Sequence, residues 1–255
     1  MINYRSITGS IALIFFLSVG MITTISAQNA EEIIDRMEDR MRGDSNYAEM
    51  TMIIERPRYT REVSMRSWSL GNDYSLIQIT SPARDQGTAF LKRENEIWNY
   101  VPNIDRTIKM PPSMMSQSWM GSDFTNDDLV RESSTVDDYE LNIIKEEEVD
   151  GRTAWVIELI PKPETPIVWG KVLMWIDQEE YLQLKVENYD QRGELANRIE
   201  FQELKEMDKR LMFSKMTMTP ADKPDQRTII VYEDMQFNIE IDPSFFTQQN
   251  MRRVR

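Results

Sequence analysis

The chain of 255 residues contains no cysteine and no histidine. Without cysteine, no disulfide bond can staple the fold and no thiol can receive a lipid. Without histidine, Ser-His-Asp and Cys-His catalysis and histidine-based zinc sites are excluded. The chain also lacks a Walker loop, a HExxH motif and a Ser-x-x-Lys motif. We therefore expect no catalytic residue, no bound metal and no cofactor, and we interpret the protein as a non-enzyme.

Positive charge is scarce in this chain, which has 30 Lys and Arg residues against 43 Asp and Glu residues and a net charge of −13. Proteins that bind nucleic acid need clustered positive charge to displace counterions, so a nucleic-acid partner is excluded. The same balance disfavours electrostatic adhesion to anionic lipid surfaces. An acidic surface suits a carrier that has to leave membranes again, and it also favours solubility in general.

Long hydrophobic runs are absent except near the start, where residues 11–22 are mostly apolar. A membrane span needs about 20 apolar residues, so this run is too short for a typical span. Arg5 precedes the run, and small residues from Thr23 to Ala27 follow it, as in a secretory signal peptide. We predict a signal peptide over residues 1–27, cleaved after Ala27. The alternative is an uncleaved anchor helix. Residues 28–255 then form a single domain.

One amphipathic helix is predicted at residues 30–42, where apolar residues recur at helical spacing. Asn29 can cap its start and Gly43 can end it. Strand-like runs of about ten residues follow with short turns between them, and we count about eleven strands. The rhythm breaks at Pro111-Pro112, and residues 113–131 are expected to contain short helices. This pattern predicts a mainly β fold, a strongly curved antiparallel half-barrel whose helices cover the concave face.

Several short motifs occur in a fixed order along the chain. They are Trp98-x-Tyr100-x-Pro102, Arg106-x-Ile108-x-x-Pro111 and Ser118-Trp119-Met120-Gly121-Ser122-Asp123-Phe124, with Ser81-Pro82, Gly87-Thr88-Ala89-Phe90-Leu91, Gly170-Lys171-Val172 and Trp175-Ile176-Asp177 around them. Together they resemble the outer-membrane lipoprotein-sorting proteins of the LolA/LolB-like superfamily. The resemblance spans roughly residues 80–190, with Trp119, Met120, Gly121, Ser122, Asp123 and Phe124 as its signature.

This resemblance implies a carrier that works in the periplasm and holds a lipid or the acyl chains of a lipoprotein in a half-barrel cavity. Transfer to or from the outer membrane would require transient membrane contact. An inner-membrane exporter of the resistance-nodulation-division (RND) type is the implied protein partner, and we expect a monomer. The identity of the cargo, the donor and acceptor membranes and the direction of transfer do not follow from the sequence.

Methionine is the first chemical clue to such a cavity, because its flexible, polarizable side chain adapts to varied apolar ligands. Ordinary core filling is the alternative explanation. From the methionine clusters, the strand parity and the aromatic positions we predict these lipid-binding residues: Met50, Met52, Trp98, Tyr100, Met114, Met115, Trp119, Met120, Leu182, Leu184, Val186, Met212, Met216 and Met218. Leu182, Leu184 and Val186 are assigned to one strand face, with Gln183 and Lys185 on the other.

Residues 112–131 can be interpreted either as a mobile lid over the cavity or as a static plug. Arg106 and Lys109 could bind a lipid headgroup phosphate through charge-assisted hydrogen bonds. The alternative for these two is cross-strand pairing with acids. A calcium site at Asp123, Asn126, Asp127 and Asp128 is disfavoured because the spacing differs from that of an EF-hand loop. We expect Asp123 and Asp127 instead to cap helix starts or to accept from backbone amides in the loop.

Two other functions compete with the carrier. The first is an envelope scaffold or glycan-binding module. Its stacking platforms would be Trp98, Tyr100, Trp119, Trp155, Trp169 and Trp175. The second is a hydrolase with paired carboxylates, for which abundant acidic residues such as Glu146-Glu147-Glu148 provide candidates without selecting a pair. A continuous apolar cavity would favour the carrier, and a polar cleft with two converging carboxylates would favour the hydrolase.

Overall fold

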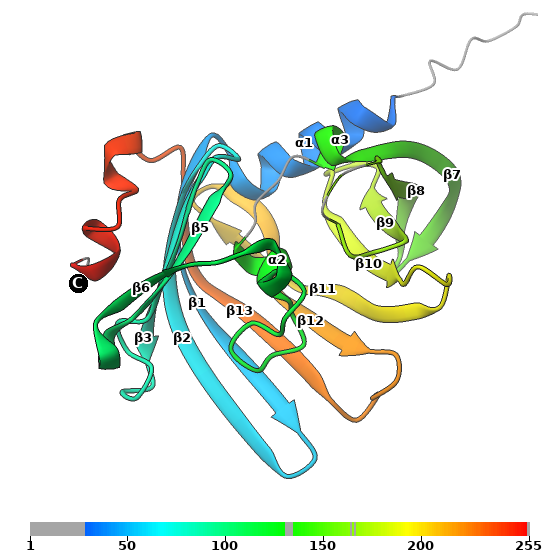
Figure 1. The fold of residues 1–255 in the computed structure, drawn as a ribbon. Helices are drawn as coiled ribbons and strands as arrows, with labels where there is room; N and C mark the ends of the chain where they lie inside the picture. The colour runs from blue at the N-terminus through cyan, green and yellow to red at the C-terminus, as the bar shows by residue number, and fades with distance from the viewer. Residues whose placement is uncertain (1–28, 131–134, 164, 166, 254–255) are drawn as a thin grey trace, which may run out of the picture.

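The computed structural model describes residues 29–130, 135–163, 165 and 167–253, and the predicted signal peptide lies outside them. Thirteen strands form one antiparallel sheet in the order β6-β5-β4-β3-β2-β1-β13-β12-β11-β10-β9-β8-β7. The sheet curves strongly and does not close, because β6 and β7 remain as its two edges (Figure 1). The predicted half-barrel is thus confirmed, with thirteen strands in place of about eleven. Within the described residues, no helix is long and apolar enough to cross a bilayer.

The sheet consists of two meanders that meet where β1 pairs with β13. The first runs outward through β1 (Ser45–Arg56), β2 (Tyr59–Leu70), β3 (Tyr74–Ser81), β4 (Ala89–Arg93), β5 (Glu96–Val101) and β6 (Arg106–Lys109). The second runs inward through β7 (Tyr139–Val149), β8 (Arg152–Pro161), β9 (Lys171–Asp177), β10 (Gln183–Tyr189), β11 (Leu195–Met207), β12 (Arg210–Pro220) and β13 (Arg227–Phe237). The chain therefore has to pass from one edge of the sheet to the other between β6 and β7.

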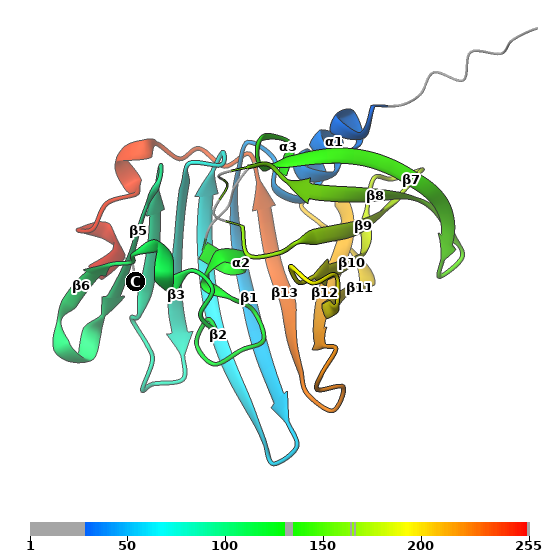
Figure 2. The same ribbon diagram turned by 45° about the vertical axis from the view of Figure 1, so that its right-hand side comes forward.

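That connection carries three short helices, η2 (Pro112–Met114), α2 (Asn126–Val130) and α3 (Thr135–Asp138). Its first part lies inside the curve of the sheet, with α2 between the two meanders (Figures 1 and 2). The break in β rhythm after Lys109 therefore marks the point at which the chain leaves one edge of the sheet for the other. A connection between opposite edges of a half-barrel has to span its open side.

Helix α1 (Ala30–Arg42) lies across one end of the half-barrel and matches the predicted helix (Figure 1). The Asn29 side chain accepts a hydrogen bond from the Glu31 amide and caps its start. At its end Gly43 has φ +61°, and a Cβ there would lie 2.6 Å from the Asn238 side chain, so glycine is required. The buried face of α1 packs on β8 and β9 of the concave side through Ile33, Ile34 and Met37.

The outer face of β3–β5 is covered by the C-terminal segment, which contains η3 (Pro243–Phe245) and η4 (Asn250–Arg252). Phe246 and Met251 are fully buried there against Leu76 and Leu91. The outer face of the second meander has its own apolar cluster around Trp175. The curved sheet is consequently packed on both faces along much of its length.

One prediction of strand faces was wrong. The pairing of β9 with β10 shifts by one residue between Gln183 and Lys185, a β-bulge at Leu184. Gln183 therefore lies opposite Ile176, whose side chain belongs to the concave cluster beneath α1. Leu184 packs instead in the cluster around Trp175, and Leu182 packs there while it also borders the cavity. Val186 packs beneath α1. A one-residue shift reverses the faces because side chains alternate with a period of two.

Candidate functional site: an apolar cavity inside the half-barrel

The concave side of the sheet encloses a cavity of about 420 Å³. Its wall is mainly apolar and includes Met50, Met174, Ile199, Met216 and Ile230 from five different strands. A volume of this size falls in the range of small-molecule ligand sites, which are commonly apolar with few polar groups. The geometry can therefore accommodate an apolar molecule without any covalent chemistry.

Helix α1 forms the roof at one end of this cavity. Arg40, Met41 and Arg42 of its last turn border the space. Polar contacts fasten the helix to the strands below it: Arg40 pairs with Glu180 at 2.7 Å and donates to the Leu211 carbonyl at 3.2 Å. Arg210 donates to the carbonyl of Asp39 at 2.6 Å. The roof is thus held at its C-terminal end.

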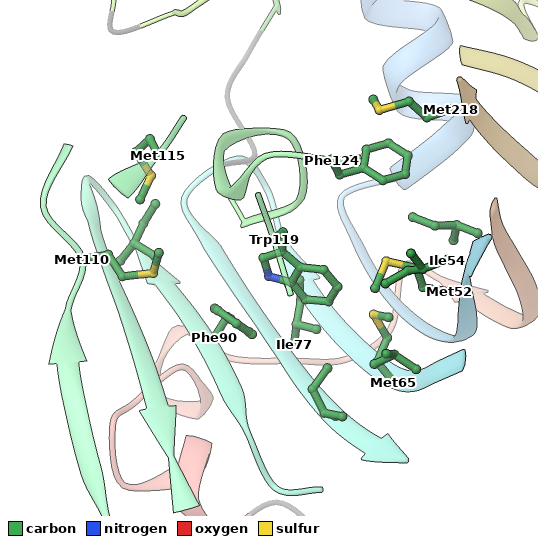
Figure 3. Packing of buried hydrophobic residues seen from close by; sticks show 14 residues of the cluster. Met52, Ile54, Met65, Ile77, Phe90, Met110, Met115, Trp119, Phe124 and Met218 are labelled. Atoms are coloured by element: carbon green, nitrogen blue, oxygen red, sulfur yellow. The ribbon is translucent and has the colours of Figure 1, made fainter. Parts of the chain in front are cut away.

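The opposite wall is formed by residues 110–126 of the connection, which we call the inner segment. Trp119 is fully buried and Phe124 is 2% exposed, and both also border the cavity. They pack with Met110 and Met115 against concave residues of the first meander, including Phe90, whose ring centre lies 5.3 Å from that of Trp119 (Figure 3). The inner segment therefore fills this half of the barrel as part of the core.

The signature residues of the inner segment form a tight turn. The Ser122 amide donates to the Trp119 carbonyl at 2.9 Å, and the Trp119 amide donates to the Phe124 carbonyl at 2.8 Å. Met120 and Gly121, the central residues, have φ +50° and +81°, as in a type I′ turn. Glycine suits the second of these positions because L-residues rarely adopt it. This turn directs the side chains of Trp119 and Phe124 into the core.

Two arginines of the β1–β2 hairpin clamp this turn from outside. Arg56 forms a bidentate pair with Asp123 at 3.0 and 3.1 Å, and both side chains are nearly buried. Thr228 of β13 also donates to Asp123, at 2.7 Å. Asp123 was expected to cap a helix or accept from backbone amides, and that prediction was wrong. Its partners are side chains from β1 and β13.

The second arginine, Arg61, donates to the carbonyl of Met120 at 2.8 Å and pairs with Asp85 at 2.7 Å. Burial alone would raise the pKa of Asp85, but hydrogen bonds from Arg84 and Arg61 outweigh it and hold the pKa below its usual value. Arg56 of β1 and Arg61 of β2 therefore hold the turn to the sheet, together with Thr228 of β13. In this structure the inner segment is packed and bonded in place.

Polar side chains interrupt the cavity wall at few positions. Asp128 borders the cavity and accepts a hydrogen bond from the Thr125 amide at 2.7 Å, while Thr125 accepts from the Asp128 amide, as in a capping box. Desolvation by the surrounding protein raises the pKa of the Asp128 carboxyl, although the residue keeps an exposed surface. Arg40 and Arg42 border the same space, but each is already paired with a glutamate. Gln183 and Asn188 complete the polar positions on β10.

The structure divides the predicted lipid-binding residues into three groups, and their lipid binding remains a prediction. Those that line the cavity are Met50, Trp119, Leu182, Val186, Met212 and Met216. Those packed in or against the core around Trp119, without bordering the cavity, are Met52, Met114, Met115, Met120 and Met218. Those that lie in outer-face clusters are Trp98, Tyr100 and Leu184.

The predicted headgroup residues lie on β6, at the edge of the sheet, and do not line the cavity. Lys109 forms an ion pair with Glu96 on the neighbouring strand, which is the cross-strand pairing considered as the alternative. Arg106 is exposed. Several lining residues were not predicted, among them Gln183, Asn188, Phe201 and Tyr232. Strand alternation could have identified Asn188, but the bulge at Leu184 conceals Gln183.

Comparison with solved structures shows the same fold in three proteins. A putative outer membrane lipoprotein-sorting protein domain from Vibrio parahaemolyticus is 27% identical with a TM-score of 0.77, covering 88% of this chain and 100% of that chain. A DUF1329 family protein from Desulfovibrio piger is 22% identical with a TM-score of 0.79, covering 87% and 97%. A LolA superfamily protein from Nitrosomonas europaea is 22% identical with a TM-score of 0.75, covering 88% and 99%.

The resemblance inferred from the sequence motifs is therefore confirmed by the fold. No curated protein matches the chain. A sequence-family model described as "-like: Uncharacterized protein" matches residues 71–253, which is more than half of the chain. The protein belongs to this family, and its fold is that of the outer-membrane lipoprotein-sorting proteins of the LolA-like superfamily.

Proposed function

We propose that this protein is a periplasmic carrier that holds the acyl chains of a lipid or lipoprotein in the cavity. It transfers this cargo to or from the outer membrane. The observation that carries the proposal is the apolar space of about 420 Å³ between the inner segment and α1. A solid core would need no such space. Apolar surface contributes about 25 cal/mol per Å² when it leaves water, so acyl chains would bind without specific polar contacts.

The wall composition supports a cargo of variable shape. Methionine side chains from β1, β2, β9, β12 and β13 border the cavity, namely Met50, Met65, Met174, Met212, Met216 and Met235. Flexible thioether side chains can repack around chains of different length, and this suits a carrier better than a site for one rigid ligand. The relative from Vibrio parahaemolyticus, named for lipoprotein sorting, supports the same class of cargo.

In this proposal the inner segment acts as a fixed plug, and access comes from another part of the cavity wall. Trp119 and Phe124 are core residues, and the Arg56 and Arg61 clamps would have to break before the segment could leave. A mobile lid usually has few buried contacts and exposed backbone hydrogen bonds.

The signal peptide, the monomeric state, transient membrane contact and an RND-type exporter as partner all remain part of the proposal. No residue is assigned a catalytic role.

The test is binding of a fluorescent fatty acyl probe to protein purified without detergent. We expect binding at micromolar level, which corresponds to about 8 kcal/mol. The matched variant Val186→Phe places a ring in the cavity from β10 and should weaken binding by more than about tenfold while the protein stays folded. Failure of the folded wild-type protein to bind any amphiphile would reject the carrier.

A further inference from the structure

Gln183 brings a carboxamide to the wall of the mainly apolar cavity. It is the first residue of β10, and its side chain is turned to the concave face by the bulge at Leu184. The residue is only 9% exposed and borders the cavity near Val172 and Val186. A glutamine at such a position is unusual, because buried polar groups are normally hydrogen-bonded.

The Gln183 carboxamide has no hydrogen-bond partner among the residues that the structure describes. Asn188, the next polar residue on this strand that borders the cavity, donates instead to Asn197 at 2.8 Å. An amide that faces a cavity without a protein partner can form its hydrogen bonds only with water or with a ligand in that cavity. A cargo that presents a hydrogen-bonding group at this depth would supply the missing partner.

The charges around the cavity select the kind of group that fits. Its two cationic side chains, Arg40 and Arg42, are paired with Glu180 and Glu38 at 2.7 Å each. The carboxyl group of Asp128, which also borders the cavity, would repel an anion. In the described wall, therefore, every cation is already neutralised, and a free carboxylate would enter without a counterion. Burying an unpaired charge is far more costly than burying a neutral carbonyl.

We propose that Gln183 is the subsite for the ester or amide carbonyl that joins an acyl chain to the rest of its cargo. The side-chain NH₂ donates to that carbonyl oxygen, and the carbonyl of Gln183 can accept from an amide or hydroxyl beside it. The cavity consequently prefers esterified or amide-linked acyl chains to free fatty acid anions and to plain hydrocarbon. This inference rests on the proposed carrier function and narrows its cargo.

Three probes with the same fluorophore and chain length test it: a labelled dodecanoic acid, its methyl ester, and the alkane analogue without a carbonyl, all titrated at pH 8. The variants are Gln183→Met, which keeps the length of the side chain and removes the amide, and Gln202→Met as a matched control on an exposed position of β11. Thermal melts establish that each variant is folded.

For wild type we expect the ester to bind more tightly than either other probe. In Gln183→Met the ester should lose about fivefold in affinity, the effect of one hydrogen bond, while the alkane changes little. Gln202→Met should match wild type.

If Gln183→Met leaves the ratio of ester to alkane affinity unchanged, or if wild type binds the carboxylate as tightly as the ester, the subsite is rejected. If no probe binds to folded wild type, the carrier proposal itself fails. Should Gln183→Met not fold, Gln183→Leu replaces it under the same criteria.

Discussion

Both meanders of this sheet are antiparallel and follow the order of the chain, but the concave side of the first is mostly filled, whereas most of the cavity lies against the second. We call them the filled half and the hollow half. In the first meander the inner segment occupies the concave side, and Trp119 and Phe124 complete a dense core. In the second meander α1 covers the concave side at one end and leaves the cavity beside it. The connection between the sheet edges, rather than the sheet itself, therefore sets which part of the concave side stays empty.

The filled half also carries more of the polar fastening of the inner segment. Arg56 and Arg61 reach across from the β1–β2 hairpin, whereas the hollow half adds the hydrogen bond from Thr228 of β13. The hollow half instead exposes Gln183 to the cavity. We therefore expect changes in the filled half to act on stability, and changes in the hollow half to act on binding.

The largest effect is expected from Phe124→Ala in the inner segment. Truncating a phenylalanine that is 2% exposed should lower the free energy of unfolding by about 3–5 kcal/mol. Phe201→Ala is the matched change in the hollow half, where the ring is half-buried and already borders empty space, and it should cost clearly less. Urea denaturation of both variants makes the comparison. Equal losses would show that the two halves are packed alike.

Breaking the clamp should have the next largest effect. Arg56→Met leaves Asp123 nearly buried without its cation, and we expect a loss of about 2–3 kcal/mol in the free energy of unfolding. The control is Arg84→Met, because the Arg84 side chain is 67% exposed and its pair with Asp85 should contribute less than about 1 kcal/mol. If both variants unfold at the same denaturant concentration as wild type, the clamp does not hold the inner segment.

Filling the cavity should separate binding from stability. Val186→Phe in the hollow half should weaken binding of a fluorescent acyl probe by more than about tenfold, or about 1.4 kcal/mol, with little change in stability. Val63→Phe in the filled half, where the side chain is fully buried and does not border the cavity, should instead destabilise by about 1–3 kcal/mol through overpacking. A Val63→Phe variant that stays stable and loses binding would reverse this assignment.

The smallest effect concerns acid sensitivity of the outer face of the hollow half. Burial would raise the pKa of Glu187, but hydrogen bonds from Tyr189 and Arg198 outweigh it and lower the pKa below 4.5. Because the folded-state pKa is depressed, this stabilisation is present above about pH 4.5 and is lost as the pH falls through the folded value. Glu187→Gln should therefore lose less stability than wild type between pH 7 and pH 3.5, measured by thermal melts. Parallel melting curves would contradict it.

Much of the fold could be predicted because it depends on local patterns. The helix at 30–42, its Asn29 cap and its Gly43 end follow from spacing and residue type, and the structure has them at the same residues. The strand positions follow from alternation and turn residues. The pairing of β1 with β13 could not be predicted, because nothing local specifies which strands meet across the length of the chain.

The site was predicted less completely, for two physical reasons. The Arg56–Asp123 pair joins residues 67 positions apart, and charged residues are too abundant in this chain for pairing to be inferred from sequence. The bulge at Leu184 reversed the face of Gln183, and a single extra residue in a strand leaves no clear compositional mark. The methionine clusters indicated an apolar interior, but not which methionines would border empty space.

Mass spectrometry of organic extracts from detergent-free protein tests the central claim most directly, with Val186→Phe purified in parallel. We predict that wild type carries acyl-linked lipid, at a level approaching one molecule per chain, and that Val186→Phe carries far less. Folded wild-type protein that yields no lipid and binds no acyl probe would contradict the claim that the hollow half is a carrier site.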